Sequence, residues 1–215
     1  MTFVRRKRTR PTLVAHRGDP RHAPENTLFS LRAAVARGAR AVEVDLRRRP
    51  DGRWVLFHDP LPRRRLPEWV PTLEQALGYC RRAGVRVYLD VKERSGERSL
   101  AQVVRKSGVW ARTVWMGGTP ATLRRMRAAA YDRPLFWVTG YRRRITSRVL
   151  ATARSIGLTG IAVYKGWVSR RTVVRTHRAG LKLFVWTARH APELRRFARM
   201  GVDGIMSEVW PPPSI

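Results

Sequence analysis

The sequence predicts an α/β protein built as a (β/α)8 TIM barrel, and three observations support this fold class. Eight short runs are rich in β-branched and aromatic residues, seven segments between them have helical periodicity, and polar side chains gather where the predicted strands end. Alternation of this kind indicates a parallel sheet, and eight strands match the number that closes a barrel. An open, doubly wound sheet is the main structural alternative.

The predicted barrel strands are short, and each is bounded by turn-forming or charged residues. They are expected at residues 12–16, 40–46, 85–91, 113–117, 135–140, 160–164, 182–187 and 204–207. An Asp-Gly turn followed by an alternating run in DGRWVLFHDP, residues 51–60, predicts a small extra hairpin after the second strand.

The segments between these strands show helical spacing of their apolar residues. We expect helices near residues 26–37, 72–83, 97–107, 119–130, 146–157, 169–179 and 190–200. Several begin with a capping residue such as Thr119 or Ser169, and several end at a glycine: Gly38, Gly84, Gly157, Gly180 and Gly201.

Length and composition favour one domain over residues 1–215, with residues 1–10 as a basic N-terminal extension. The chain has 215 residues and 43% hydrophobic content, enough for one substantial core. No apolar run approaches the ~20 residues that cross a bilayer, and no apolar signal segment follows the basic start, so a cytoplasmic location is expected. The single cysteine, Cys80, excludes an internal disulfide and fits the apolar pattern of a core position.

The formal net charge of +30 is extreme, with 45 Lys and Arg against 15 Asp and Glu. Such a surface attracts polyanions in a salt-dependent way. Only five of the basic residues are lysines and the arginines occur in every segment, so a compositional bias towards arginine is the simpler interpretation. We expect solvated charges in the clusters Arg5–Arg10, Arg47–Arg49, Arg63–Arg65 and Arg142–Arg144. No nucleic-acid motif is present, so nucleic acid is not expected as a specific partner.

Two pairs of residues at strand ends could carry chemistry. His16 and Arg17 fall at the end of the first strand, and Glu43 and Asp45 fall at the end of the second. Residues two apart on a strand share a face, so the two carboxylates could hold one hard divalent cation. A solvated or salt-bridged pair of carboxylates is the structural alternative.

The third strand and the hairpin add further polar groups. Asp90 and Lys92 share a face at the end of the third strand, and His58 ends the predicted hairpin strand WVLFH, just before Asp59. Taken singly, each also fits a structural ion pair or a structural histidine. Together with the groups on the first two strands they supply what phosphoryl transfer requires: a cation site, fixed positive charges and two proton-transfer groups.

The sequence resembles the glycerophosphodiester phosphodiesterases, which are TIM-barrel enzymes. The stretches AHRGDPRHAPENT, VEVDL, VLFHDP, YLDVKE, VWTAR and MGVDGIMSE are similar to the signature blocks of that family, in order, from about residue 12 to residue 208. The resemblance therefore covers nearly the whole chain.

The resemblance implies a role for each matching residue. The general acid and base would be His16 and His58. The ligands of one Mg²⁺ or Ca²⁺ ion would be Glu43, Asp45 and Asp90. The phosphate would be held by Arg17 and Lys92, with support from Glu25 and Asn26. Trp186 would form part of the substrate wall, although a core tryptophan fits this position equally well.

The implied reaction cleaves a small phosphodiester such as glycerophosphocholine into glycerol 3-phosphate and an alcohol. In the family's usual route, the neighbouring glycerol hydroxyl attacks phosphorus while one histidine removes its proton and the other protonates the departing alkoxide. Water then opens the cyclic phosphate.

Three departures from the family pattern leave other substrates open. Asp90 stands where the family usually has Glu, the insertion between His58 and Thr72 is shortened, and Ser207-Glu208 replaces Thr-Asp. A more open pocket would suit a lysophospholipid, as in lysophospholipase D-like or sphingomyelinase D-like relatives, and a basic surface would suit peripheral contact with an anionic membrane. A non-catalytic, polyanion-binding barrel is the third alternative.

Overall fold

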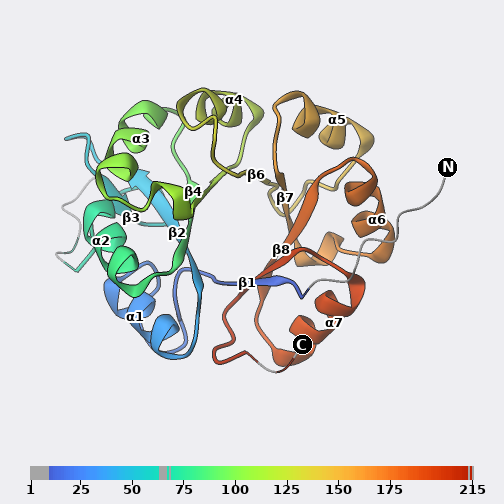
Figure 1. The fold of residues 1–215 in the computed structure, drawn as a ribbon, viewed down its shortest axis with the longest axis horizontal. Coiled ribbons are helices and arrows are strands. Elements are labelled where there is room, and N and C mark those ends of the chain that lie inside the picture. Colours follow the sequence, from blue (N-terminus) through green and yellow to red (C-terminus); the bar gives the residue numbers. More distant parts are fainter. Residues whose placement is uncertain (1–9, 63–66, 68, 213, 215) are drawn as a thin grey trace.

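The computed structural model describes residues 10–62, 67, 69–212 and 214, and its centre is a closed barrel of parallel strands (Figure 1). Each strand pairs with its neighbours in parallel register, and pairing of the first strand with the second closes the ring. The barrel strands are β1 (Thr12–Ala15), β2 (Ala41–Arg48), β4 (Arg86–Val91), β5 (Thr113–Gly117), β6 (Leu135–Val138), β7 (Gly160–Tyr164), β8 (Lys182–Ala188) and β9 (Gly204–Ser207). The predicted TIM barrel is confirmed.

Seven helices form an outer ring around these strands in the described part of the chain (Figure 1). They are α1 (Leu28–Ala36), α2 (Leu73–Ala83), α3 (Glu97–Lys106), α4 (Pro120–Ala129), α5 (Ser147–Ser155), α6 (Arg170–Arg178) and α7 (Ala191–Met200). Thr119 and Ser169 cap α4 and α6 as expected, because each side chain accepts a hydrogen bond from a first-turn backbone N–H. Two short 3₁₀ helices, Trp110–Arg112 and Lys165–Trp167, were not predicted.

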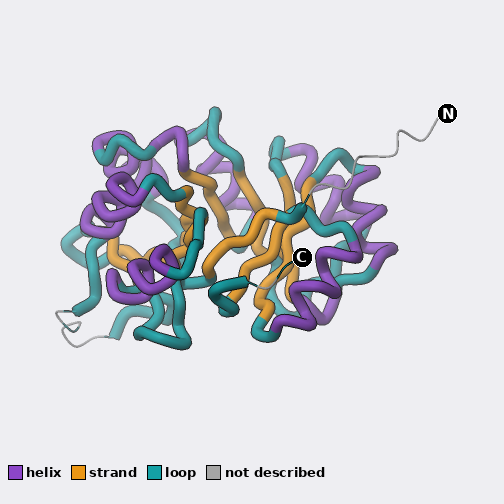
Figure 2. Tube along the Cα trace, turned by 60° about the horizontal axis from the view of Figure 1, so that its bottom comes forward, coloured by secondary structure: helices purple, strands orange, loops and turns teal. Residues whose placement is uncertain are grey.

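Alternation along the strands builds two apolar layers, one inside the barrel and one between strands and helices. Figure 2 shows the strands at the centre and the helices outside them. On β8, for example, Phe184 points into the barrel while Leu183 and Val185 pack outwards. Cys80 is fully buried in the outer layer, which confirms its predicted core position. No described helix is long and apolar enough to cross a membrane.

The extra hairpin strand is shorter than predicted. β3 (Trp54–Leu56) pairs antiparallel with the far end of β2, and the strand ends two residues before His58 rather than at it. Because β3 runs back towards the barrel, Phe57 reaches the level of Asp45, to whose carbonyl oxygen its N–H donates at 3.0 Å. The hairpin therefore returns the chain to the rim formed by the carboxyl ends of the barrel strands.

Two of the predicted arginine clusters lie wholly or mostly outside the described residues. Arg63–Arg65 belong to the shortened insertion, and of Arg5–Arg10 only the last residue is described. The basic N-terminal extension and the single-domain boundaries stay predictions.

Candidate active site

Three carboxylates converge inside the barrel at the carboxyl rim. Glu43 and Asp45 point inward from β2 because they continue the inward face of that strand, and Asp45 stands directly opposite Asp90 on β4. All three side chains are buried, and an oxygen from each lies within 4.8 Å of the other two. The predicted cluster of acidic residues is therefore a single group in space.

Two cationic side chains contact these carboxylates. Lys92 Nζ lies 2.8 Å from Asp45 Oδ1 and 2.6 Å from Asp90 Oδ2. Arg17 Nε lies 2.8 Å from Asp45 Oδ2, and the Arg17 backbone N–H donates to Glu43 Oε2 at 3.0 Å. The two predicted phosphate-binding cations thus sit beside the predicted metal ligands.

A tight turn after β1 positions Arg17. This residue adopts a left-handed backbone conformation with φ of 57°, which is uncommon outside glycine and directs its N–H towards Glu43. Gly18 follows with φ of 85°, and a Cβ there would lie 2.5 Å from Ser30 Oγ and 2.7 Å from its carbonyl oxygen. Only glycine fits this position, because both the backbone angle and the space exclude a side chain.

Asn26 joins this turn to β2. Its amide donates to Asp45 Oδ2 at 2.9 Å and accepts from the Asp45 backbone N–H at 3.0 Å. β1 pairs with β2 only at Val42. Beyond that point the Asn26 side chain, rather than the β1 backbone, accepts the hydrogen bond from the Asp45 N–H. Glu25 lies further out and pairs with Arg17 at 2.7 Å. Both side chains therefore contact groups of the site, and their predicted support of phosphate binding stays a prediction.

Burial and the mutual proximity of the charges shift the pKa values in different directions. Burial, reinforced by the charges of Asp45 and Asp90, raises the pKa of Glu43 well above its ordinary value. Although burial alone would raise it, the pKa of Asp45 is lowered to about 2 by Lys92 and Arg17. Burial opposes the charged form of Lys92, but Asp90 and Asp45 raise its pKa overall. Arg17 and Lys92 therefore stay positively charged, beside three carboxyl groups that would carry more charge than these two cations if all were ionised.

This donor set fits a hard divalent cation. Within the described chain, Glu43 Oε1 and Asp90 Oδ1 accept no hydrogen bond, so each keeps an oxygen available for coordination. Oxygen ligands are what Mg²⁺ and Ca²⁺ prefer, and both ions accept water or phosphate oxygens to complete their coordination. A bound cation would also offset the repulsion by Asp45 and Asp90 that, together with burial, raises the pKa of Glu43.

The two predicted catalytic histidines differ in their surroundings. His16 is largely buried, and its Nδ1 lies 3.4 Å from Glu208 Oε1. Burial lowers the pKa of His16, an effect that Glu208 partly opposes. His58 is more exposed, and its Nδ1 lies 2.7 Å from Asp59 Oδ1. Among the described residues, no hydrogen bond or ion pair joins the His58 ring to the carboxylate cluster.

Two residues that the sequence analysis did not assign to the site hold these histidines. Glu208 contacts His16, and Arg47 donates from Nη2 to the His58 carbonyl oxygen at 2.9 Å and from Nη1 to the Lys92 carbonyl oxygen at 3.2 Å. Glu208 directly follows the last barrel strand, so the rule that rim residues carry function could have found it. Arg47 lay within an arginine cluster interpreted as solvated, and nothing in the pattern distinguished it.

Trp186 lies apart from the carboxylates, in an aromatic group at the same rim. Its ring packs edge-on against Tyr141, with the ring centroids 4.8 Å apart, and its centroid lies 5.5 Å from that of the Tyr164 ring. The indole N–H donates to the Ala162 carbonyl oxygen at 3.3 Å, and the side chain rests on the inner apolar layer. It is half-buried, between the two roles that the sequence left open.

The family model for the glycerophosphoryl diester phosphodiesterase family matches residues 16–72 and 60–209. These segments contain every residue of the site. The chain belongs to this family.

Curated relatives agree over part of their length. Glycerophosphodiester phosphodiesterase 1 of Mus musculus is 32% identical over an alignment of 128 residues, and the match covers 46% of this chain and 39% of that protein. The protein of the same name from Bos taurus is 33% identical over an alignment of 119 residues, and the match covers 41% of this chain and 36% of that protein. The match thus spans about two fifths of these relatives.

Solved structures extend the likeness to nearly the whole barrel. A putative glycerophosphodiester phosphodiesterase from Galdieria sulphuraria has a TM-score of 0.83 at 21% identity, with 94% of this chain and 95% of that chain covered. A phosphodiesterase from Oleispira antarctica, solved with the product sn-glycerol-3-phosphate, has a TM-score of 0.80 at 20% identity, with 93% of each chain covered. At these identities the likeness establishes the fold.

Proposed function

We propose that this protein is a metal-dependent phosphodiesterase that hydrolyses a glycerophosphodiester to glycerol 3-phosphate and an alcohol. The observation that carries the proposal is the convergence of three buried carboxylates, Arg17 and Lys92 at one rim, with His16 beside them. Membership of the family and the product bound by the Oleispira antarctica phosphodiesterase support the same reaction class.

The cation site consists of Glu43, Asp45 and Asp90. A bound Mg²⁺ or Ca²⁺ would supply positive charge against the phosphate oxygens as charge develops on them. Asp90 is shorter by one methylene than the usual glutamate of the family, so a water molecule has room in the coordination shell.

Arg17 and Lys92 provide the fixed charge for the phosphate. Both stay protonated at neutral pH, because neighbouring carboxylates raise their pKa values. A guanidinium presents two parallel N–H groups to phosphate oxygens, whereas an ammonium acts as a point charge. Glu25 and Asn26 hold the turn that orients Arg17.

His16 is suited to be the proton acceptor. Its lowered pKa keeps the imidazole neutral at neutral pH, so it can take the proton of the glycerol hydroxyl that attacks phosphorus. Glu208, 3.4 Å from Nδ1, stabilises the imidazolium that forms. His58, the more exposed of the two histidines, would give a proton to the departing alkoxide, and water would then open the cyclic phosphate. Trp186 would line the substrate pocket.

The test is glycerol 3-phosphate release from glycerophosphocholine with Mg²⁺ or Ca²⁺ present. We expect turnover by the wild type and a loss of at least ~100-fold in His16→Ala, the lower range for one acid–base group. His177→Ala is the matched control, because that imidazole pairs with Asp203 far from the carboxylates. Equal activity of His16→Ala and the wild type would refute the assigned role.

A further inference from the structure

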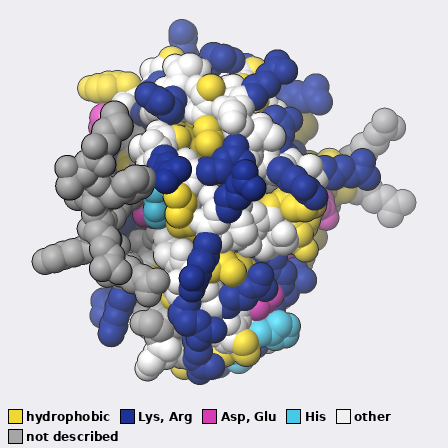
Figure 3. All heavy atoms as spheres, turned by 90° about the vertical axis from the view of Figure 1, so that its right-hand side faces the viewer, with side chains coloured by type: hydrophobic (Ala, Val, Ile, Leu, Met, Phe, Trp, Pro, Cys, Tyr) yellow, Lys and Arg dark blue, Asp and Glu magenta, His cyan; other side chains and the backbone are white. Residues whose placement is uncertain are grey.

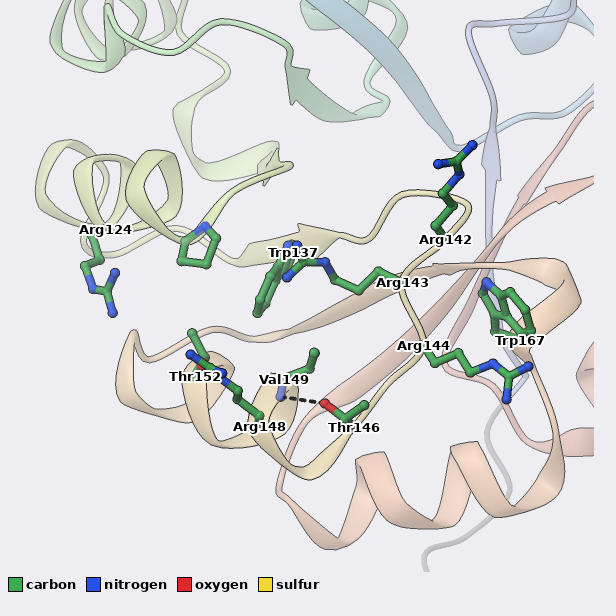
Figure 4. Close-up of a pocket in the computed structure, with 11 residues that line it drawn as sticks. Arg124, Trp137, Arg142, Arg143, Arg144, Thr146, Arg148, Val149, Thr152 and Trp167 are labelled. Atoms are coloured by element: carbon green, nitrogen blue, oxygen red, sulfur yellow. Dashed lines mark hydrogen bonds between the residues drawn. The ribbon is translucent and has the colours of Figure 1, made fainter.

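A second feature of the molecule lies outside the catalytic cluster. A pocket of about 740 Å³ opens between α4 and α5, against the outer face of β6 (Figure 4). Its lining contains no acidic side chain and five arginines: Arg124, Arg142, Arg143, Arg144 and Arg148. In Figure 4 the Arg143 and Arg144 side chains extend towards Trp137 and Trp167, while Arg142 points the other way.

These arginines differ from those of the catalytic rim in having no carboxylate partner. Within the described residues, none of the five forms an ion pair, whereas Arg17, Arg47 and Arg189 each do. Arg143 lies over Trp137 with its Cζ 5.3 Å from the ring centroid, and Arg144 lies over Trp167 at 4.4 Å. The pocket therefore concentrates positive charge that only an external anion can neutralise.

The charge of the whole chain is asymmetric in the same direction. Residues 98–192 carry 20 basic residues and one acidic residue, a net of +19, while the other 120 residues carry 25 basic and 14 acidic residues, a net of +11. Figure 3 shows basic side chains distributed over the face that includes α6. A general bias towards arginine explains the many basic residues, but it does not explain why the acidic ones are missing from this half.

Aromatic side chains accompany the charge at the catalytic rim. Tyr141 is 64% exposed on the loop between β6 and α5, Trp69 is 55% exposed before α2, and Phe29 is 63% exposed at the start of α1. All three follow the carboxyl ends of strands. Among the described residues, only one other aromatic ring is this exposed: Tyr131, which precedes β6 at the opposite end of the barrel. Exposed aromatic rings beside basic groups are typical of surfaces that insert into a membrane interface.

We propose that the loop of residues 139–146 and its arginine pocket dock the catalytic rim onto an anionic phospholipid membrane. The arginines would bind lipid headgroup phosphates, and Tyr141 would enter the interface beside them. We commit to a lipid surface rather than nucleic acid, because exposed rings on three segments of one rim can enter an interface together and the sequence contains no nucleic-acid motif. The inference rests on the proposed function in one respect, the assignment of Trp186 to the substrate pocket. The Tyr141 ring packs against Trp186 with the ring centroids 4.8 Å apart, so the loop lies beside that proposed pocket.

The experiment is co-sedimentation with vesicles of phosphatidylcholine alone and vesicles that also contain phosphatidylglycerol. The test variant is Arg142→Gln/Arg143→Gln/Arg144→Gln. The control, Arg195→Gln/Arg196→Gln/Arg199→Gln, removes the same charge from the exposed face of α7. We expect the test variant to lose on the order of 100-fold in partitioning to the anionic vesicles, and the control to lose far less. Equal losses would overturn the proposal, because they would show attraction by diffuse charge.

A second variant guards against misfolding, and a second ligand tests the choice of partner. Arg142 and Arg148 are exposed and form no hydrogen bond, ion pair or ring contact within the described chain, so Arg142→Gln/Arg148→Gln should fold normally and still lose vesicle binding. Single-stranded DNA should lose no more affinity in the Arg142–Arg144 variant than in the α7 control variant, because both remove the same charge; a loss equal to that for vesicles would overturn the commitment to lipid. Turnover of glycerophosphocholine by the wild type without vesicles reports on the proposed function separately.

Discussion

Removing the Asn26 amide should destabilise the fold through two buried hydrogen bonds. In Asn26→Gly the Asp45 N–H is left without an acceptor, at a cost of about 1–3 kcal/mol, and the ionised Asp45 carboxylate loses a hydrogen bond worth roughly 1.5–3 kcal/mol. Arg17 and Lys92 still contact that carboxylate, so the two contributions do not add fully. We expect the free energy of unfolding to fall by about 2–4 kcal/mol.

Two further variants separate the causes of this loss. Asn26→Ala should cost on the order of 1 kcal/mol more than Asn26→Gly, because alanine resists the left-handed backbone at φ of 56°. Gln75→Ala removes an amide that accepts the Thr72 N–H at 2.9 Å, but at an exposed helix cap, so its loss should be only about 1 kcal/mol.

The assay is equilibrium urea unfolding followed by circular dichroism, with the four proteins compared under the same conditions. Burial should make the difference in stability, since both amides accept a backbone N–H and only that of Asn26 is buried. A loss of unfolding free energy in Asn26→Gly no larger than that in Gln75→Ala would refute this role of burial.

Three other predictions follow from the same geometry. Gly18→Ala should destabilise the protein well beyond Gly38→Ala, since both have positive φ but only the first Cβ meets neighbouring atoms; similar melting temperatures would contradict this. The kcat/KM of the free enzyme should rise with pH through a midpoint below the ordinary histidine value of 6.5, because the lowered pKa keeps His16 neutral above it; a limb centred above 6.5 would exclude His16 as the base. Treatment with EDTA should abolish hydrolysis, and added Mg²⁺ or Ca²⁺ should restore it. Asp90→Ala should need a cation concentration at least ~10-fold higher for this recovery, while Asp132→Ala should behave as the wild type. An equal cation requirement in Asp90→Ala and the wild type would count against the cation site.

The elements of the barrel could be predicted closely from the sequence, because local signals coincide with the tertiary structure. Every predicted barrel strand and helix is present within two residues of its expected bounds. The hairpin strand β3 is the exception: it ends before His58 because its pairing with β2 covers only three residues. The residues Phe-His-Asp that follow Leu56 contain no signal that the pairing stops there.

The site could be predicted in outline because strand ends in a parallel barrel meet at one rim. That rule brought together Glu43, Asp45 and Asp90 from two strands. It could not show that the Asn26 side chain accepts the Asp45 N–H in place of the β1 backbone, since that depends on where β1 diverges from β2. Nor could it distinguish Arg47, which holds the His58 and Lys92 carbonyls, from its solvated neighbours.

The most direct test of the cation site is anomalous diffraction from crystals grown with Mn²⁺ and glycerol 3-phosphate. We predict one strong anomalous peak among the carboxylates of Glu43, Asp45 and Asp90, with the phosphate between that ion and the side chains of Arg17 and Lys92. An ion bound elsewhere, or a phosphate that contacts neither cationic side chain, would contradict the account.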